Sequence, residues 1–353
     1  MKQYIFTPGP TPMSKETLLL GKKQVPYFRN KYFSNIVLES KRLLLKLANA
    51  PKNSEVIFLT ASGSGAMEAT VINLFDSNDN VIVINSGGFG ERFVNICEIH
   101  KIPHKNIKIK HNQKIDFKNL KTIKADGFLI NAHETTTGRF FDMKKIGKFC
   151  KKNNLLNVVD AISCFTTDKI DMKKHHIDAL IISSNKGLAL PPGLAMVILS
   201  PKALARIKNS NTLYFNFKDY IDNIQRGQTP FTPAISVMIQ LHAKLKHLDK
   251  IGIKKQIRKA KKLSKYFRKE ISVLGYEFYT KNMPNAMTAL RVPKNQDALK
   301  IIDDFEKKYN IILTPSGGKL KHKLIRVSHM GEMDKKYIDI LIKRLKHYHK
   351  KSK

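Results

Sequence analysis

Lys186 stands at the end of an apolar run, within the stretch SSNKGLALPPG of residues 183–193. The run before it, residues 178–183 (DALIIS), has the composition of a buried strand. A lysine in a partly desolvated crevice has a lowered pKa, and its neutral amine is a nucleophile for carbonyl groups. Lys186 is therefore a candidate catalytic nucleophile.

Asp160 directly follows the preceding apolar run, residues 155–159. This position lies at the carboxyl edge of a sheet, where ligands bind in open α/β folds. Taken alone, an aspartate here is as readily a helix N-cap. If the two strands are neighbours, Asp160 and Lys186 face the same crevice. An aspartate that faces a pyridine nitrogen keeps the ring protonated and makes it an electron sink.

Residues 60–68 (TASGSGAME) separate a predicted strand from a predicted helix. The glycines permit close approach of a ligand, and the helix start with the hydroxyls of Ser62 and Ser64 forms an anion site around Gly63. Neither a dinucleotide fingerprint nor a Walker A loop is complete here, and a purely structural turn is the alternative. A phosphate cradle, an aspartate for a ring nitrogen and an amine for a carbonyl are together what pyridoxal 5'-phosphate requires.

The elements that must position these residues alternate between short β-branched runs and helical patterns. The predicted strands are residues 55–60, 80–84, 126–131, 155–159 and 178–183. The predicted helices are residues 66–75, 90–100 and 143–153. Continuous apolar runs of this kind suit strands that are buried on both faces of a mostly parallel sheet. The sequence therefore predicts an α/β fold with helical crossovers.

The pattern changes after about residue 235. Apolar residues recur at helical spacing over residues 253–271, strands are expected at residues 287–292 and 324–327, and a last helix at residues 334–348. We therefore expect a smaller α+β domain at the end of the chain. The predicted organisation is an N-terminal arm (residues 1–14), a large cofactor-binding domain (residues 15–245) and a C-terminal small domain (residues 246–353).

Composition narrows the class of protein. The chain has 353 residues and a formal net charge of +36, but its lysines are spread along the whole sequence. This favours a solvated basic surface over a nucleic-acid interface, which needs a clustered patch. The cysteines at positions 97, 150 and 164 have neither metal-site spacing nor a disulfide pattern. Without a signal peptide or an apolar span, a cytoplasmic location without membrane partners is expected.

The sequence resembles the class V pyridoxal-phosphate-dependent aminotransferases, which include 2-aminoethylphosphonate–pyruvate, alanine–glyoxylate and serine–pyruvate transaminases. The motifs that carry the resemblance are TPGP (7–10), ASGSGAMEA (61–69), NSGGFGERF (85–93), HETTTG (133–138), VDAIS (159–163), SSNK (183–186) with LPPG (190–193), GQTPFTP (227–233) and IRVSHMGE (325–332). The resemblance implies the aspartate aminotransferase-like fold of type I pyridoxal-phosphate transferases.

The resemblance also implies roles for single residues around the cofactor. Ser62, Gly63 and Ser64 match the phosphate loop. Phe89 matches the ring that stacks on the cofactor, and Thr135 the hydroxyl near its phenolic oxygen. Asp160 matches the aspartate on the ring nitrogen, and Lys186 the lysine that forms the Schiff base. Asn185 stands where many relatives have glutamine, and its amide can reach the phosphate.

Other matched residues imply contacts with the substrate and with a second subunit. Thr229 and Thr232 match a loop that reaches the neighbouring subunit's phosphate, which implies a homodimer with shared active sites. Arg326 matches the arginine that binds the substrate carboxylate through a bidentate pair. Arg29 is a second candidate for binding a phosphonate or carboxylate, with a basic surface turn as the alternative.

The substrate is the least constrained part of the prediction. HETTTG, the Asn185–Lys186 pair and the Met-Gly-Glu after Arg326 are similar to 2-aminoethylphosphonate transaminases, so we expect this amine as donor and pyruvate as acceptor. The segment VPYFRNK (25–31) is closer to alanine/serine–glyoxylate transaminases, which are the alternative. Less favoured alternatives are a cysteine desulfurase-like enzyme and a basic nucleic-acid-binding protein that retains the fold.

Overall fold

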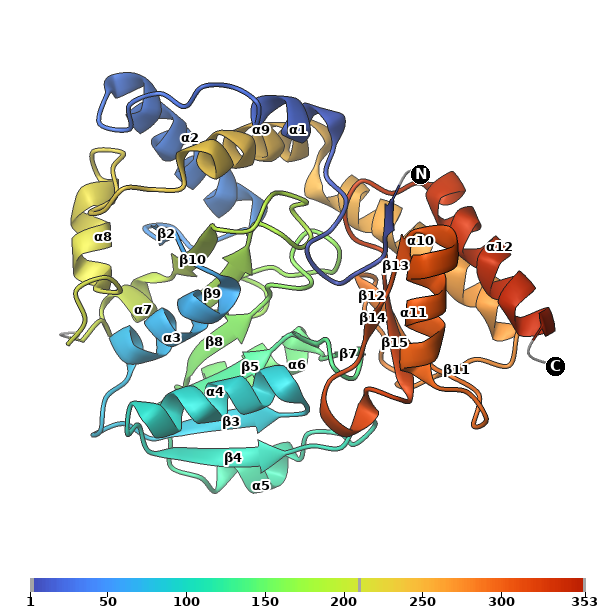
Figure 1. Cartoon of the computed structure of the whole chain (residues 1–353). Helices are drawn as coiled ribbons and strands as arrows, with labels where there is room; N and C mark the ends of the chain where they lie inside the picture. The colour runs from blue at the N-terminus through green and yellow to red at the C-terminus, as the bar shows by residue number, and fades with distance from the viewer. Residues whose placement is uncertain (1–2, 209–210, 352–353) are drawn as a thin grey trace.

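In the computed structural model, a seven-stranded sheet forms the centre of the larger part of the molecule (Figure 1). The structure describes residues 3–208 and 211–351. The strands, in spatial order, are β2 (Glu55–Leu59), β10 (Ala195–Leu199), β9 (Ala179–Ser183), β8 (Leu156–Asp160), β5 (Gly127–Asn131), β3 (Val81–Asn85) and β4 (His104–Lys108). Only β10 runs against its neighbours. The mostly parallel sheet that the sequence predicts is confirmed.

Two of these strands were not predicted from the sequence. Strand β4 at the sheet edge reads HKNIK and is half exposed, so it lacks a continuous apolar run. Strand β10 (AMVIL) is fully buried but follows the Pro-Pro-Gly of residues 191–193, which reads as a loop. Its antiparallel direction allows a short return from β9 in place of a helical crossover.

Helices cover both faces of the large sheet. The helices on one face are α2 (Lys31–Leu47), α6 (Met143–Lys152) and α9 (Ile235–Ile251), and those on the other are α3 (Gly63–Leu74), α4 (Gly88–Ile99) and α8 (Phe217–Ile224). Alternate residues of a strand enter the two cores, as Leu180 and Ile181 of β9 do. This double burial explains why the strands are continuously apolar in sequence.

A smaller unit follows α9. Its antiparallel sheet has the order β11 (Glu277–Phe278), β12 (Met287–Arg291), β15 (Leu324–Ser328) and β14 (Thr314–Pro315), and it packs with α10 (Ile253–Ser272), α11 (Ala298–Tyr309) and α12 (Lys335–Lys351). Strand β1 (Tyr4–Ile5) pairs in parallel with β13 (Ile311–Ile312), as Figure 1 shows. The first residues of the proposed arm thus pack with the small unit.

The short remaining elements connect these layers. They are α1 (Lys15–Leu20), α5 (Phe117–Lys121), the hairpin of β6 (His133–Glu134) and β7 (Arg139–Phe140), α7 (Pro201–Leu204) and the 3-10 turn η1 (Gly318–Leu320).

The proposed division at residue 245 falls inside α9, whose buried Leu248 belongs to the large core. A domain boundary at Gly252, which lies between α9 and α10 and has a φ of 81°, agrees better with the packing. Within the described residues, no helix is both long and apolar enough to cross a bilayer.

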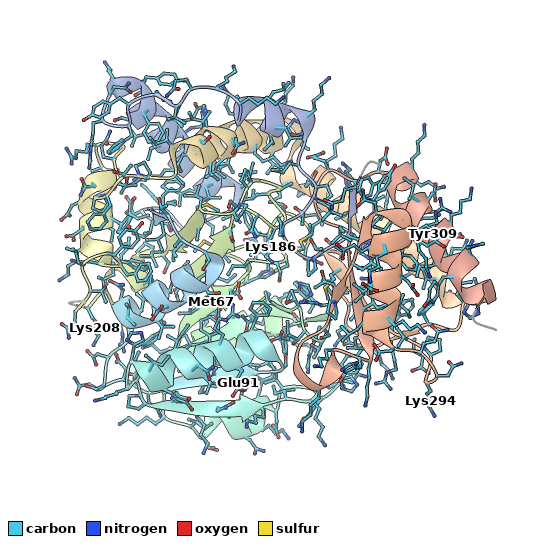
Figure 2. All side chains as sticks on the ribbon, in the orientation of Figure 1. Met67, Glu91, Lys186, Lys208, Lys294 and Tyr309 are labelled. Carbon is cyan, nitrogen blue, oxygen red and sulfur yellow. The ribbon has the colours of Figure 1, made fainter. Side chains whose placement is uncertain are left out.

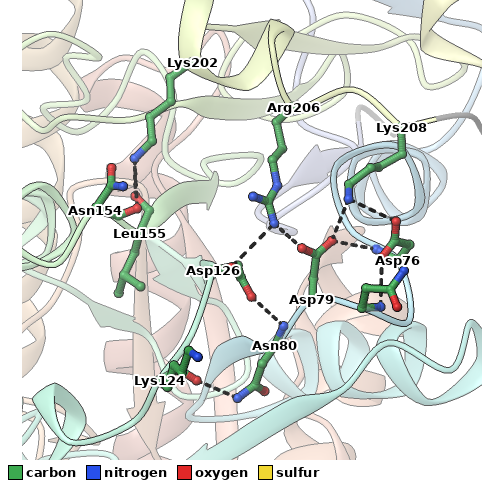
Figure 3. Close-up of polar contacts among 11 residues, drawn as sticks. Asp76, Asp79, Asn80, Lys124, Asp126, Asn154, Leu155, Lys202, Arg206 and Lys208 are labelled. Carbon is green, nitrogen blue, oxygen red and sulfur yellow. Dashed lines mark hydrogen bonds and ion pairs between the residues drawn. The ribbon is translucent and has the colours of Figure 1, made fainter.

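An ion-pair network joins the amino-terminal ends of the parallel strands (Figure 3). Asp79 precedes β3, Asp126 precedes β5, and Arg206 follows α7 and pairs with both carboxylates. Lys208 Nζ lies 3.0 Å from Asp76 Oδ2 and 3.5 Å from Asp79 Oδ2. The network therefore lies at the edge of the sheet opposite to the carboxyl ends, where a structural role is expected.

Replacing Arg206 with glutamine is expected to destabilise the fold, because the side chain of Asp79 is only 7% exposed and loses its main partner. We expect the free energy of unfolding, measured by urea denaturation, to fall by about 1–3 kcal/mol. The control is Lys208→Gln, which should cost less than about 1 kcal/mol, because Lys208 Nζ lies closer to Asp76, whose side chain is 37% exposed, than to Asp79. An Arg206→Gln variant with the urea midpoint of the wild type would contradict this role.

Candidate active site

A cavity of about 470 Å³ opens at the carboxyl ends of β2, β8 and β9. The residues predicted from sequence that line it are Ser62, Gly63, Ser64, Phe89, Asn185 and Lys186. Figure 2 shows Lys186 near the centre of the molecule, between the large sheet and the small unit. Segments that are far apart in the sequence therefore meet at the sheet edge that the sequence indicates.

Lys186 is half buried just after β9. Burial, helped by the positive charge of Arg326 and opposed by Asp160, lowers the pKa of its amino group to about 8. The N-terminal TPGP motif limits the space around this amine, since a Cβ atom at Gly9 would lie 2.3 Å from Lys186 Nζ. Thr11 Oγ1 donates a hydrogen bond of 2.9 Å to the Lys186 carbonyl. The N-terminal segment thus helps to position the nucleophile.

Asp160 is the last residue of β8, and β8 lies beside β9, as expected. Its Oδ1 accepts a 2.7 Å hydrogen bond from Ile162 N, and its Oδ2 accepts one of 2.5 Å from Asn131 Nδ2. Burial raises the pKa of this carboxyl to about 6, although both hydrogen bonds favour the ionised form. A carboxylate that is excluded from water is stabilised in its ionised form by a cationic partner.

The phosphate loop begins helix α3. Ser62 is the N-cap of this helix, and its Oγ accepts a hydrogen bond of 3.2 Å from Gly65 N. A Cβ atom at Gly63 would lie 2.6 Å from Ile162 Cδ1, so only glycine fits there without a shift. The amides at the helix start therefore face the cavity without an intervening side chain, as an anion site requires.

The β6–β7 hairpin supplies a carboxylate that the sequence analysis missed. Glu134 Oε2 accepts hydrogen bonds from Phe89 N (3.1 Å) and Gly90 N (3.0 Å), and Oε1 accepts one from Thr136 N (3.0 Å). Glu134 thus fixes the start of α4 and with it the ring of Phe89. The next residue, Thr135, has a buried hydroxyl with no hydrogen-bond partner among the described residues. An unpartnered buried hydroxyl suits a ligand atom.

Arg92 is a second residue that the sequence analysis missed. Its guanidinium carbon lies 4.7 Å from the centroid of the Phe89 ring, and Nη1 donates a hydrogen bond to Ser64 Oγ. Arg92 therefore ties the predicted stacking ring to the phosphate loop. The signal for it was the NSGGFGERF motif itself, because Phe89 and Arg92 are three positions apart and therefore lie on one helix face.

Replacing Arg92 with glutamine is expected to weaken cofactor binding about tenfold, because the variant loses the cation–π contact and the support of Ser64. Titration of the cofactor-free protein with pyridoxal phosphate, followed by absorbance, measures this Kd. The matched control is Arg344→Gln, which removes a cation–π contact with Tyr309 (4.6 Å) in the small unit. Equal affinities for Arg92→Gln and the wild type would show that Arg92 does not position the loop.

Arg326 lies on β15 of the small sheet, and its charge acts on Lys186. Its Nε donates a hydrogen bond of 2.9 Å to Pro315 O. Its two terminal nitrogens have no ion pair or hydrogen bond within the described part of the chain. Burial lowers the pKa of this guanidinium, and Glu134 opposes the shift. The two terminal nitrogens of the Arg326 guanidinium are therefore suited to bind a carboxylate through a bidentate pair.

Asp160, Thr135 and Arg326 do not line this cavity, and neither do the other predicted contact residues, Arg29, Thr229 and Thr232. Arg29 is exposed and donates hydrogen bonds to Thr229 O (3.1 Å) and Pro230 O (3.2 Å). Thr229 Oγ1 donates to Phe231 O (2.7 Å), and Thr232 is exposed. The structure thus joins Arg29 to the 227–233 loop and does not bring either to Lys186 within one chain.

The cysteines do not provide the reactive thiol that a desulfurase needs. Cys97, Cys150 and Cys164 are all buried and free. Burial raises the pKa of the Cys97 thiol to about 12 and also raises those of Cys150 and Cys164. Buried thiols of this kind are poor nucleophiles.

Comparison with known proteins identifies the family of this chain. The model of the family "Aminotransferase class-V" matches residues 24–333, and the chain belongs to this family. It is a pyridoxal-phosphate-dependent aminotransferase. The residues present fit this cofactor, because Asp160 offers a buried carboxylate, Thr135 an unpartnered hydroxyl and Lys186 an amine of lowered pKa.

The relatives cover nearly the whole chain. An uncharacterized aminotransferase of Helicobacter pylori is 30% identical over 93% of this chain and 88% of its own length. A serine–glyoxylate aminotransferase of Arabidopsis thaliana is 24% identical over 94% of this chain and 86% of its own. The structure of an alanine–glyoxylate aminotransferase from Nostoc sp. has a TM-score of 0.93, with 19% identity, over 98% of this chain and 95% of the other. The expected aspartate aminotransferase-like fold is confirmed.

Proposed function

We propose that this aminotransferase moves an amino group from a small amino acid, alanine or serine, to glyoxylate. The observation that carries the proposal is Arg326, whose charge acts on Lys186 and whose terminal nitrogens have no partner among the described residues, so that they suit the carboxylate that both substrates share. Serine–glyoxylate and alanine–glyoxylate aminotransferases are among the similar proteins, which also supports this substrate class.

The proposal departs from the phosphonate donor expected from the sequence motifs. That expectation needs a cation for the phosphonate, and Arg29 was a candidate. Within one chain, the Arg29 guanidinium is bound to Thr229 and Pro230 carbonyl groups and lies outside the cavity. The similarity to glyoxylate aminotransferases therefore favours the alternative that the sequence left open.

The residues around the cavity have distinct tasks in such a reaction. Bound pyridoxal phosphate supplies a carbonyl group that condenses with amines and a ring that accepts negative charge. Lys186 Nζ, with a pKa near 8, is able to take up a proton and return it close to neutral pH. The Asp160 carboxylate would keep the pyridine nitrogen of the cofactor protonated, and Arg326 would orient the substrate carboxylate. Phe89, fixed by Glu134, restricts the tilt of a flat ring.

The test is a screen of half-reactions with the purified, cofactor-loaded protein. Alanine, serine and 2-aminoethylphosphonate are added separately, and the change in cofactor absorbance is followed in stopped flow. The pyridoxamine form is then mixed with glyoxylate or pyruvate. We expect alanine or serine to react faster than the phosphonate, and glyoxylate faster than pyruvate. A phosphonate that reacts faster than both amino acids would restore the first expectation.

We further propose that the enzyme works as a cytosolic homodimer with shared active sites. Thr229 and Thr232 lie outside their own chain's cavity, as residues that serve a partner's cavity must. The three free, buried cysteines suit a reducing compartment. Sedimentation velocity of the holoenzyme should show a dimer. A fully active monomer would contradict the shared sites.

A further inference from the structure

A second cavity, of about 870 Å³, lies between the large unit and the loop that joins β11 to β12. One wall contains β7 and the start of α6, and the other contains residues 281–283. A hydrogen bond of 2.7 Å from Phe140 N to Asn282 O joins the two walls. None of the lining residues also lines the cavity around Lys186. The second cavity is therefore separate from the active site.

Positive charge gathers around this second cavity. The lysines that line it are Lys114, Lys144, Lys145, Lys169 and Lys281. Lys145 Nζ lies 4.0 Å from Asp142 Oδ2. The ammonium groups of the other lysines have no ion pair or hydrogen bond within residues 3–208 and 211–351. Asp142 is the one carboxylate among the described lining residues, so most of the positive charge of these lysines is not balanced, and a multivalent anion relieves their mutual repulsion.

Arg139 adds an independent sign of an anion site. It is 4% exposed, lines the cavity, and its Nε is buried without a hydrogen-bond partner among the described residues. Its terminal nitrogens donate to the carbonyl groups of Lys110 and Gln113, and its guanidinium carbon lies 4.3 Å from the Phe141 ring centroid. No carboxylate of the described chain pairs with it. A buried guanidinium that is held only by neutral groups retains an unbalanced positive charge.

Apart from Asp142, His175 and Asn282, the rest of the lining is apolar and partly aromatic. It includes the rings of Phe117 and Phe140 and the side chains of Met143 and Met283. Rings and thioethers of this kind form contact surfaces for a flat heterocycle. The volume lies within the range of about 300–1,000 Å³ that is usual for small-molecule sites. Cations and an aromatic surface thus meet in one cavity of suitable size.

We propose that this second cavity binds a nucleoside diphosphate or triphosphate, with the phosphates on the lysines and Arg139 and the base against the aromatic lining. A single phosphate would leave most of the lysines unpaired, whereas a diphosphate carries enough charge for several of them. The ribose and base would fill the apolar part. The proposal does not depend on which amino donor the active site takes.

The experiment is titration calorimetry of the full-length, pyridoxal-phosphate-loaded protein with ADP at fixed ionic strength. Loading the active site first prevents ADP from binding to the phosphate loop there. We expect saturable binding of one ADP per chain and no binding of adenosine. The double variant Lys144→Gln/Lys281→Gln should weaken ADP binding at least about tenfold, because two charge-assisted contacts are lost.

The control must separate this cavity from the general basic surface. The double variant Lys261→Gln/Lys265→Gln removes the same charge from the exposed side of α10, outside both cavities. We expect it to bind ADP as the wild type does. The proposal is overturned if ADP binding does not saturate, if both double variants weaken it equally, or if inorganic triphosphate binds as tightly as ADP.

Discussion

Replacing Lys186 with alanine is expected to lower transamination by at least about 10⁴-fold, since the variant loses both the nucleophile and the proton carrier of the site. The lowered pKa of about 8 means that about a fifth of the wild-type amine is neutral near physiological pH, far more than at the ordinary value of 10.5, and burial is the main cause. No other lysine within residues 3–208 and 211–351 lines the cavity, so none of these amines is placed to take over. The measurement is the steady-state rate with the best donor from the half-reaction screen.

The proposed covalent link between Lys186 and the cofactor gives a readout besides activity. Borohydride reduction of the wild-type holoenzyme should add the mass of the cofactor to the peptide that contains Lys186. The Lys186→Ala variant should show no modified peptide, while it retains the wild-type melting temperature within a few degrees. The control is Lys202→Ala, because Lys202 Nζ donates hydrogen bonds to the Leu155 and Asn154 carbonyl groups at the opposite edge of the sheet. Full activity in Lys186→Ala, or cofactor on another lysine, would refute the assignment.

The sequence was most informative where one element determines both structure and chemistry. The buried strands β8 and β9 are continuous apolar runs that end in Asp160 and Lys186, and parallel pairing brings their carboxyl ends to one edge. The glycine turn before α3 is equally local, since a Cβ atom at Gly63 would lie close to Ile162 just after β8. Strand ends and helix starts are therefore enough to predict which side chains meet at this edge of the sheet.

The supporting residues could not be predicted in the same way, because their roles depend on contacts between distant segments. Glu134 binds the amides of Phe89 and Gly90 from the β6–β7 hairpin, and no periodicity in the sequence indicates this pairing. The restriction of Lys186 by Gly9 likewise depends on how the first residues cross the molecule. The position of Arg29 beside Thr229 follows from the packing of α2 against α9 and the loop before it.

The second large effect is expected for Asp160→Asn, which should lower the rate of transamination by at least about 10³-fold. The amide is neutral and cannot stabilise a proton on the ring nitrogen, so the electron sink is lost. The fold should tolerate the change. Asn131 Oδ1 has no partner among the described residues, and a flip of the Asn131 amide would let it accept a hydrogen bond from the new NH₂ group.

Stability without cofactor distinguishes this electrostatic role from structural damage. The pKa of Asp160 in the folded protein is about 6, above its ordinary value of 3.8. The carboxyl group therefore stabilises the cofactor-free protein below about pH 4, and this contribution is lost as the pH rises through 6. At pH 7, cofactor-free Asp160→Asn should thus be at least as stable to urea as the wild type, whereas pyridoxal phosphate should stabilise the wild type more. A variant that is clearly less stable than the wild type without cofactor would show that Asp160 acts mainly through the packing of the sheet edge.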